Sequence, residues 1–546
     1  MRRHAQVRRY LTAFDTARLP QVFTDVLVIG SGVAALRAAL EMAPALHVTL
    51  LTKRALTESN SFYAQGGIAA AIVPDDSIES HVADTLATGC GLSDETVVRQ
   101  VVGAAPGCIR ELMDWGAEFD KVGDRISAGR EGGHSAPRVI HARGDETGKE
   151  ITSALLDRVA QSESIDVRDN TYVIDLLVVD GAVVGALAWH AQHGMLVVRA
   201  RRTVLASGGL GRMYRETTNP EVATGDGLAM AYRAGAVLAD LEFVQFHPTT
   251  LYIAGASRHL ISETVRGEGG RLVDKAGRPF MHAYHPMGDL APRDIVSRAI
   301  LDHMRKTGAT NVFLDLTGFG PNVRRRFPGI AKACAQFDID IARDRIPVRP
   351  SAHYMVGGVR VDAVGRTSLG HLYACGEASS TWLHGANRLG SNSLLEGLVY
   401  GRLAGRHIVE DLAGTSAGDR AGAEAPERIR SDVSRSTRGE LHLPDVSDSL
   451  RALMWRYVGI ARSADDLIEA DALIEFWQSY VLDKVFDQSG GWELQNMLTL
   501  GRLMAHAALL RTETRGVHYR ADHPDRDDAH WQKHILVCRD REPWFE

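Results

Sequence analysis

The stretch "DVLVIGSGVAAL", residues 25–36, decides the fold of this chain. Its apolar run at 26–30 predicts a short buried strand, and the alanine-rich run at 33–43, which Pro44 ends, predicts a helix. Between them Gly30 to Ala35 fits the pattern G-x-G-x-x-G/A, which holds a dinucleotide pyrophosphate at a helix N-terminus. "HVTLLT", residues 47–52, predicts the second strand. The four segments predict the opening βαβ unit of an α/β, Rossmann-like domain.

The acid that normally holds an adenosine ribose is missing from this unit. It is expected about 20 residues after the glycine-rich loop, where Thr52 and Lys53 end the second strand. Two interpretations stay open at this point. The loop is only a tight strand–helix turn, or Lys53 contacts ribose or phosphate in place of the acid.

Residues 172–207 have the pattern of a three-stranded β-meander. Asp180-Gly181 is a hairpin signal, and Gly194 stands at the next turn. The last strand, "TVLAS", is apolar and runs into Gly208-Gly209. A βαβ unit followed by a meander that returns to a buried strand is typical of flavin-type dinucleotide domains.

The rest of the chain divides by composition. A stretch rich in Arg and Pro, from about residue 247 to 353, interrupts the glycine-rich sequence. Residues 412–437 are mostly small or charged. Near the C-terminus, one helical face is formed by Leu494, Met497, Leu498, Met504 and Ala508. The predicted parts are a disordered basic extension (1–21), a flavin-type dinucleotide-binding domain (22–246 and 354–411), an inserted α+β capping domain (247–353), a linker (412–437) and a C-terminal helical domain (438–546).

The bulk composition excludes several classes of function. The 546 residues carry a net charge of −6 with acids and bases mixed, which gives no footprint for nucleic acid. No apolar run approaches the roughly 20 residues that span a bilayer, so we expect no membrane contact. Five scattered cysteines indicate a reducing, cytoplasmic setting. The pair His282 and His285 lacks further ligands nearby, so no metal site is expected.

Motifs downstream of the phosphate loop point to one family. They are "SNSFYAQGGIAAA" (59–71), "REGGHS" (130–135), "TGDGLAMA" (224–231), "EFVQFHPT" (242–249), "ETVRGEGG" (263–270), "APRDIVSRAI" (291–300), "SAHYMVGGV" (351–359) and "YACGEASSTWLHGANRLGSNSLLEG" (373–397). With these motifs in matching order from about residue 22 to about residue 540, the sequence resembles the fumarate reductase and succinate dehydrogenase flavoprotein family.

The resemblance implies that the dinucleotide is FAD. The residues that it places at the cofactor are Gly30, Ser31, Gly32, Val33, Ala34, Lys53, Asn60, Ser61, Phe62, Tyr63, Ala64, Gln65, Gly66, Gly67, Asp226, Glu377, Ser393 and Leu394. Relatives that attach FAD covalently carry a histidine five residues before the glutamine of A-Q-G-G. Asn60 stands there, so we expect non-covalent FAD.

The resemblance also implies a dicarboxylate substrate. His247, His353 and Arg388 are expected to hold its carboxylates, and a guanidinium matches a carboxylate in two-point geometry. Arg293 matches the family residue that handles the substrate proton, and Glu263 and Arg266 occupy proton-relay positions. A free arginine is normally a permanent cation, so two roles for Arg293 stay open, a base or an electrostatic anchor.

Three features favour an amino-acid-oxidising member of the family. They are Asn60, Glu131 in "REGGHS", which can face a substrate ammonium, and the segment "GSNSLLEG". The expected reaction is oxidation of L-aspartate to iminoaspartate with dioxygen or fumarate as acceptor. It is the first step of de novo NAD synthesis, with quinolinate synthase as functional partner.

Two alternatives remain from the sequence. The first is the flavoprotein subunit of a fumarate reductase or succinate dehydrogenase, which the C-terminal "PDRDDAHWQKH" also resembles. The second is a non-catalytic FAD-binding module, against which the presence of His247, His353 and Arg388 argues.

Overall fold

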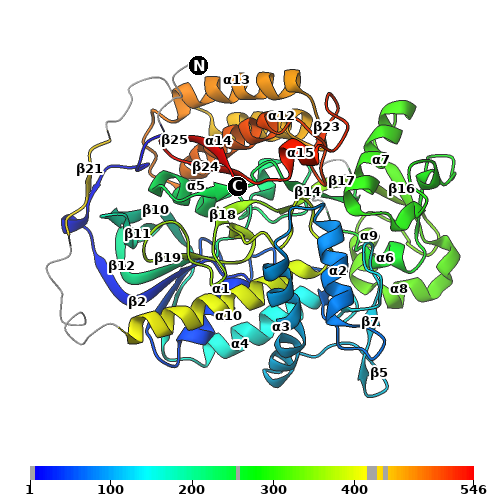
Figure 1. Ribbon diagram of the computed structural model, residues 1–546, viewed down its shortest axis with the longest axis horizontal. Helices are drawn as coiled ribbons and strands as arrows, with labels where there is room; N and C mark the ends of the chain where they lie inside the picture. The colour runs from blue at the N-terminus through cyan, green and yellow to red at the C-terminus, as the bar shows by residue number, and fades with distance from the viewer. Residues whose placement is uncertain (1–6, 254–258, 415–426, 434–440) are drawn as a thin grey trace.

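The computed structural model describes residues 7–253, 259–414, 427–433 and 441–546 (Figure 1). The quoted stretch forms the end of β2 (Gln21–Ile29) and the start of α1 (Val33–Met42), and β3 (Val48–Leu51) follows. β2 pairs in parallel with β3. The predicted βαβ unit is therefore confirmed, with a longer first strand than expected.

The unit lies in the middle of a seven-stranded sheet. Its order is β10-β11-β12-β2-β3-β9, and β19 pairs with β12. The other members are β9 (Ile165–Arg168), β10 (Thr171–Val179), β11 (Ala182–His190), β12 (Gly194–Leu205) and β19 (Leu372–Ala374). β10, β11 and β12 form the predicted meander, and the Asp180-Gly181 turn has positive φ at both residues, as a type I′ hairpin requires.

Helix α10 (Asn392–Ala413) packs along α1 on one face of this sheet. The two backbones approach closely because glycines of α10 face α1. A Cβ on Gly401 would lie 2.6 Å from the Ala34 carbonyl oxygen. The glycine-rich α10 therefore holds the start of α1, and with it the phosphate loop.

The capping region has a core of its own. Its sheet has the order β14-β17-β16-β15, built from β14 (Val244–Leu251), β15 (Arg271–Val273), β16 (Val312–Asp315) and β17 (Ile346–Met355). α7 (Arg293–Thr307) packs against β14 (Figure 1, green). The predicted domain boundaries fall inside β14 and β17, so these two strands lead into and out of the cap.

The C-terminal region contains α12 (Leu443–Tyr457), α13 (Ala464–Val481) and α14 (Ser489–Leu510). The predicted apolar face of α14 is buried, and so is most of the rest of that helix. The chain then ends in β24 (Ile535–Cys538) and β25 (Arg541–Phe545), which extend a sheet of order β20-β18-β13-β24-β25. The C-terminal region is therefore not helical alone.

The remaining elements of the described chain are short strands and helices. They are β1 (Phe14–Asp15), β4 (Ile68–Ala69), β5 (Lys121–Val122), β6 (Arg125–Ile126), β7 (Ala128–Gly129), β8 (Val139–Ile140), β13 (Leu238–Ala239), β18 (Gly358–Arg360), β20 (Ser379–Ser380), β21 (Arg430–Ser431), β22 (Ala461–Arg462), β23 (Tyr519–Arg520), α2 (Ile78–Thr88), α3 (Glu95–Asp114), α4 (Thr147–Ala160), α5 (Asp226–Ala234), α6 (Thr264–Gly267), α8 (Val323–Arg326), α9 (Pro328–Ala335) and α15 (Asp528–Trp531).

The N-terminal segment differs from the expectation of a disordered extension over 1–21. Leu11 and Phe14 are buried in a small apolar cluster, and β1 pairs with β21. The prediction is wrong for residues 7–21, because their apolar side chains find a place against the meander; residues 1–6 lie outside the described part. β21 belongs to the predicted linker 412–437, of which residues 415–426 and 434–437 also lie outside it.

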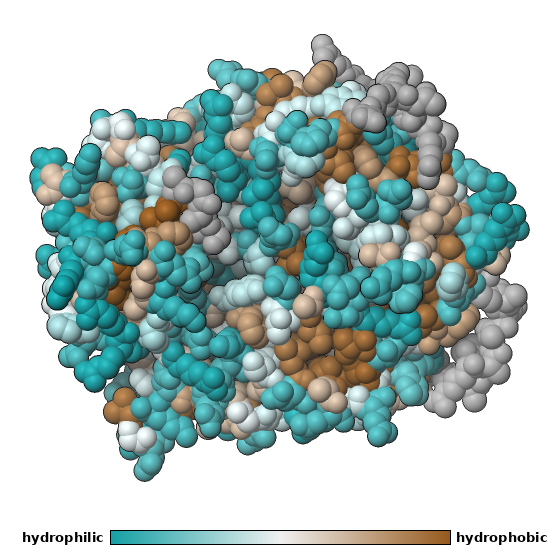
Figure 2. All heavy atoms as spheres, turned by 180° about the vertical axis from the view of Figure 1, so that it is seen from behind, coloured by the Kyte–Doolittle hydropathy of each residue, from teal (hydrophilic) through white to brown (hydrophobic). Residues whose placement is uncertain are grey.

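The face in Figure 2 is mostly hydrophilic (teal), with apolar patches (brown) between the hydrophilic areas. Among the described residues, no helix combines the length and the hydropathy that a bilayer crossing needs.

Candidate active site

A cavity lies between the central sheet and the cap. Its walls include the loop after β2, His247 of β14, His353 of β17 and the start of α10. The cavity therefore joins the predicted cofactor residues to the predicted substrate residues.

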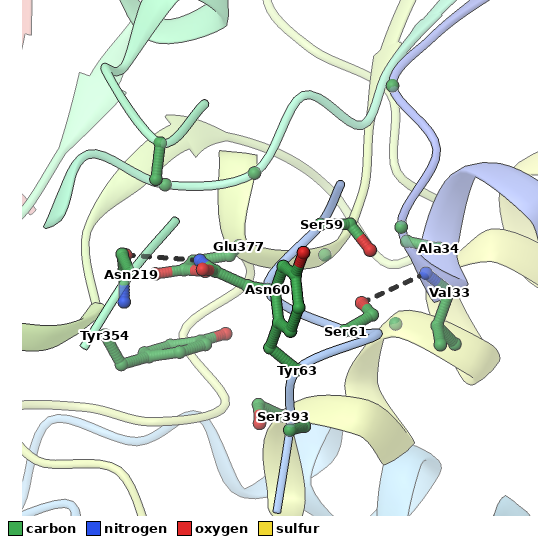
Figure 3. A pocket seen from close by; sticks show the side chains of 18 of the residues that line it. Val33, Ala34, Ser59, Asn60, Ser61, Tyr63, Asn219, Tyr354, Glu377 and Ser393 are labelled. Carbon is green, nitrogen blue, oxygen red and sulfur yellow. Dashed lines mark hydrogen bonds between the residues drawn. The ribbon is translucent and has the colours of Figure 1, made fainter. Parts of the chain in front are cut away.

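The phosphate loop forms one end of this cavity. Gly30 has φ +125°, and a Cβ there would lie 2.1 Å from the Ala206 carbonyl oxygen, so no other residue fits. Gly32 is the N-cap of α1 and has no side chain to cap it. The Val33 amide donates to Ser61 Oγ at 3.1 Å (Figure 3). The helix N-terminus, with its partial positive charge, is therefore available to an anion.

The structure brings nearly all predicted cofactor residues to this cavity. Those that line it are Gly30, Ser31, Gly32, Val33, Ala34, Lys53, Asn60, Ser61, Tyr63, Ala64, Gln65, Gly66, Gly67, Asp226, Glu377, Ser393 and Leu394. Phe62 does not line it; its ring packs edge-on against the Tyr63 ring, with centroids 5.7 Å apart.

Lys53 is held by two carboxylates from distant parts of the chain. Its Nζ lies 2.6 Å from Asp226 Oδ2 and 2.9 Å from Glu493 Oε1. Burial alone would raise the pKa of Asp226, but the Lys53 charge and hydrogen bonds from Asn496 and Thr224 outweigh it and hold that pKa below its usual range. Asp226 and Glu493 thus bring two carboxylates to the end of β3, although the sequence at the end of that strand contains no acid.

The middle of the cavity carries polar groups suited to a flavin. Asn60 Nδ2 donates to Glu377 Oε2 at 2.9 Å and to Asn219 Oδ1 at 3.2 Å (Figure 3). Gln65 Oε1 is buried and has no hydrogen-bond partner within the described part of the chain. A buried acceptor of this kind is costly unless a ligand satisfies it. The open helix end, the close-approach glycines and this orphaned oxygen together fit FAD.

The other end of the cavity gathers the predicted substrate residues. His247 on β14 and His353 on β17 lie on neighbouring antiparallel strands, with ring centroids 5.2 Å apart. Gln245 Oε1 accepts from Arg388 Nε at 3.2 Å and from Arg293 Nη1 at 3.3 Å. Two guanidinium groups and two imidazoles therefore converge on one space.

The charged groups that line this end are the guanidinium groups of Arg293 and Arg388 and the carboxylates of Glu131 and Glu263. Burial, and then the charges of neighbouring arginines, hold the pKa values of His247 and His353 well below the usual histidine value. Both rings are therefore neutral near pH 7. Burial and the nearby Arg293 lower the pKa of Arg388 to about 10. Such a site favours an anion that neutralises the guanidinium groups.

The proposed relay residues lie behind Arg293. Glu263 Oε2 accepts from Arg293 Nε, and Glu263 Oε1 accepts from Arg266 Nη2 at 2.8 Å. Arg266 is buried but does not line the cavity. Glu263 therefore links an arginine in the site with one outside it.

Glu131 lies beside these residues, in the loop between β7 and β8, and is 3% exposed. Its Oε2 accepts from Ser391 Oγ at 3.0 Å, and its Oε1 accepts from Thr264 Oγ1 at 3.1 Å. Burial opposes ionisation, but His141 and Arg293 more than offset it, so the pKa of Glu131 is below its usual range. The side chain is a carboxylate fixed at the substrate end.

Sequence reasoning missed Gln245, Thr264, Ser391 and Glu493. Gln245 stands two residues before His247, and the period of a strand puts both on one face, so this residue could have been found. Ser391 has a positive φ of 64° directly before α10, which no single-sequence pattern announces. Glu493 reaches Lys53 across 440 positions of sequence.

Comparisons with known proteins agree with this geometry. The family model "FAD binding domain" matches residues 25–394, and "Fumarate reductase flavoprotein C-term" matches residues 447–544. An L-aspartate oxidase of Streptomyces coelicolor is 42% identical, over 94% of this chain and 91% of that one. One of Bacillus subtilis is 41% identical, over 94% and 93%. The solved E. coli quinol fumarate reductase is 34% identical with TM-score 0.88, over 97% of each chain.

Proposed function

The chain belongs to the L-aspartate oxidase family, and from that premise we propose how its residues oxidise L-aspartate. The reaction gives iminoaspartate, with dioxygen or fumarate as electron acceptor, and opens de novo NAD synthesis. The observation that carries the assignment of roles is the convergence of Arg293, Arg388, His247 and His353 beside Glu131 in one cavity.

FAD would be held along the cavity from the phosphate loop to the substrate end. Gly32 and the N-terminus of α1 would hold its pyrophosphate, and Lys53 and Asp226 would hold its adenosine side. Asn60 and Glu377 would line the flavin side, and Asn60 has no group for a covalent link. The bound cofactor would supply a hydride acceptor for the substrate Cα–H bond.

Arg388 and Arg293 bind the two substrate carboxylates. Each guanidinium presents paired N–H donors, and the shared acceptor Gln245 Oε1 fixes the distance between them. The neutral imidazoles of His247 and His353 add donors without repelling the guanidinium groups. With both carboxylates fixed, the substrate has one orientation. The orientational entropy is lost on binding and not in the reaction step, which lowers the barrier.

Glu131 receives the substrate ammonium. A buried carboxylate without a substrate cation is incompletely satisfied here, since Arg293 Nη2 is 3.9 Å from its Oε2. An ammonium completes its coordination, whereas the methylene of succinate cannot. Glu131 therefore selects the amino dicarboxylate.

Arg293 acts as an electrostatic anchor in this proposal. Its Nε donates to the Glu263 carboxylate, which also accepts a hydrogen bond from Arg266. The chain Arg266–Glu263–Arg293 orients the anchor against the substrate.

The setting and partners follow from the product. Iminoaspartate hydrolyses readily, so we place quinolinate synthase directly downstream as a functional partner. All five cysteines are unpaired, which supports the reducing cytoplasm as its location. A lack of any rise in quinolinate yield when the two proteins are mixed would contradict this link.

A purified, FAD-loaded chain tests the function. With L-aspartate and dioxygen, and with no other subunit present, it should produce hydrogen peroxide and iminoaspartate. Added quinolinate synthase should convert that imine to quinolinate. Turnover of succinate but not of aspartate would support the fumarate reductase alternative, which the 34% identical E. coli structure favours. Turnover of neither would leave a cofactor-binding module.

A further inference from the structure

His141 lies next to the substrate end and has no part in the scheme above. It directly follows β8 and is 4% exposed. Its Nε2 is 3.1 Å from Thr264 Oγ1 and 3.9 Å from Glu131 Oε1. Thr264 Oγ1 is also 3.1 Å from Glu131 Oε1. A single hydroxyl thus bridges the imidazole and the carboxylate that faces the substrate amine.

The chemistry of an amino acid requires a base at this place. A substrate ammonium has no free electron pair, so it must lose a proton before the Cα–H bond can transfer a hydride. Glu131 is the carboxylate in contact, but the charges of its neighbours keep its pKa low. A carboxylate that prefers to stay ionised cannot keep the proton, so the proton needs a further acceptor.

We propose that His141 is a positioning residue for amine oxidation that takes up the ammonium proton from Glu131 through the Thr264 hydroxyl. The inference rests on the proposed function. In the step, the N–H bond breaks and the proton moves to Glu131 Oε1. The Thr264 hydroxyl, which donates to Glu131 Oε1 in the structure, then turns to donate to His141 Nε2. Its Oγ1 receives the proton from Glu131 as its own proton passes to Nε2. The amine becomes neutral, Glu131 and Thr264 return to their starting forms, and His141 becomes an imidazolium.

The neighbouring histidine cannot replace His141. His134 Nδ1 lies 3.2 Å from Arg138 Nη1, which can only donate, and its Nε2 lies 3.0 Å from the Gly390 carbonyl oxygen, which can only accept. The ring is therefore neutral with both nitrogens engaged. Burial, together with the charge of Arg138, holds its pKa below the usual value.

The charges around the relay favour this direction of transfer. Arg293 and the imidazole of His134 face Glu131, and Glu263 is paired with Arg293 and Arg266. Within the described residues, His141 Nε2 lies near the Thr264 hydroxyl and the Glu131 carboxylate. A proton on His141 is paired with the Glu131 carboxylate, whereas a proton left on the amine adds charge beside Arg293.

The relay is tested by replacing its ends separately in the FAD-loaded protein. His141→Gln removes the imidazole, and Thr264→Val removes the bridging hydroxyl. We expect each to lower kcat/KM for L-aspartate by about 10²-fold or more, since acid–base groups contribute about 10²–10⁴-fold.

Fumarate reduction by the same variants separates the relay from a structural role. Fumarate has no amine, so its reduction should stay within about twofold of wild type. Thr264→Ser should restore most of the aspartate activity that Thr264→Val loses. If His141→Gln does not bind FAD, the aspartate and fumarate activities of Thr264→Val test the relay instead.

Two results would overturn the inference. They are parallel losses with aspartate and fumarate, or full aspartate activity in Thr264→Val. A wild-type protein that does not oxidise aspartate at all would instead overturn the proposed function, so the two failures are distinguishable.

Discussion

Glu131 is the residue on which substrate choice depends in this account. It is a buried carboxylate held by Ser391 and Thr264, with the Arg293 guanidinium at a longer distance. Its neighbours fix its position before any substrate enters. That leaves the ammonium of aspartate as the group that completes its surroundings.

Glu131→Gln should therefore affect aspartate far more than fumarate. Loss of a hydrogen bond to a charged group costs about 1.5–3 kcal/mol, so the KM for aspartate should rise about tenfold or more. Steady-state kinetics with both substrates measure the split. Equal changes in the two KM values would reject the role of Glu131 at the amine.

The lowered pKa of Arg388 predicts an alkaline limit for anion binding. With a pKa of about 10, the guanidinium is charged below that pH and loses its proton above it, earlier than an ordinary arginine. Fumarate affinity, followed through the flavin spectrum, should hold to about pH 9 and weaken through about pH 10. Constant affinity to about pH 11 would contradict the burial argument.

At the scale of elements, the phosphate loop depends on contacts that a sequence motif only implies. Gly30 joins β2 to α1 under the Ala206 carbonyl, and α10 holds α1 from the other side. The βαβ unit and the meander could be predicted because their signals are local, namely apolar runs and turn residues. The pairing of β24 with β13 and the contact of Glu493 with Lys53 could not, because they join segments remote in sequence.

Gly30→Ala should abolish stable FAD binding. An added Cβ meets the Ala206 carbonyl oxygen at 2.1 Å, in a backbone conformation that L-residues avoid. Gly103→Ala on α3 is the matched control, because its Cβ meets nothing within 4 Å and alanine favours a helix. Fluorescence titration with FAD measures both. Wild-type affinity in Gly30→Ala would show that the loop does not hold the pyrophosphate.

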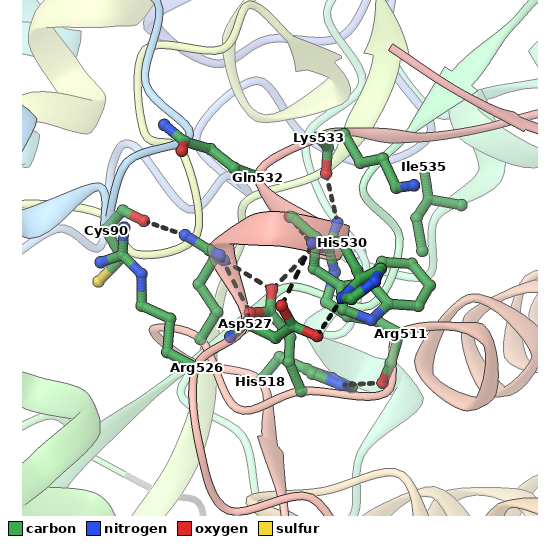
Figure 4. A network of polar contacts seen from close by, with 12 residues as sticks. Cys90, Arg511, His518, Arg526, Asp527, His530, Gln532, Lys533 and Ile535 are labelled. Atoms are coloured by element: carbon green, nitrogen blue, oxygen red, sulfur yellow. Dashed lines mark hydrogen bonds and ion pairs between the residues drawn. The ribbon is translucent and has the colours of Figure 1, made fainter.

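At the scale of the whole molecule, a buried ionic network joins the C-terminal segment to the rest of the chain (Figure 4). Glu513 is fully buried and pairs with Arg511 at 3.1 Å and with Arg515 at 2.6 Å. Arg511 also reaches Glu242, next to the entry into the cap, and Arg515 donates to the Cys90 carbonyl. Glu513 is therefore shared by two arginines that connect three regions.

Glu513→Gln should destabilise the fold. It removes the carboxylate that Arg511 and Arg515 share and leaves each with one other acid, Glu242 and Asp528 respectively. Breaking a buried ion pair costs about 3–5 kcal/mol. Glu95→Gln is the control, because its pair with Arg99 on α3 is exposed and worth at most about 1 kcal/mol. Urea unfolding of the FAD-loaded protein measures the free energies. Similar losses in both variants would mean that the network adds nothing specific.

The convergence of two arginines and two histidines beside FAD is the central claim, and anaerobic reduction tests it most directly. L-Aspartate is added to the FAD-loaded protein without dioxygen, and the visible absorbance of the flavin is followed. We expect it to bleach with aspartate in the wild type, and not in Arg293→Leu that still holds FAD. An unbleached wild type, or bleaching in Arg293→Leu at the wild-type rate, would contradict the account.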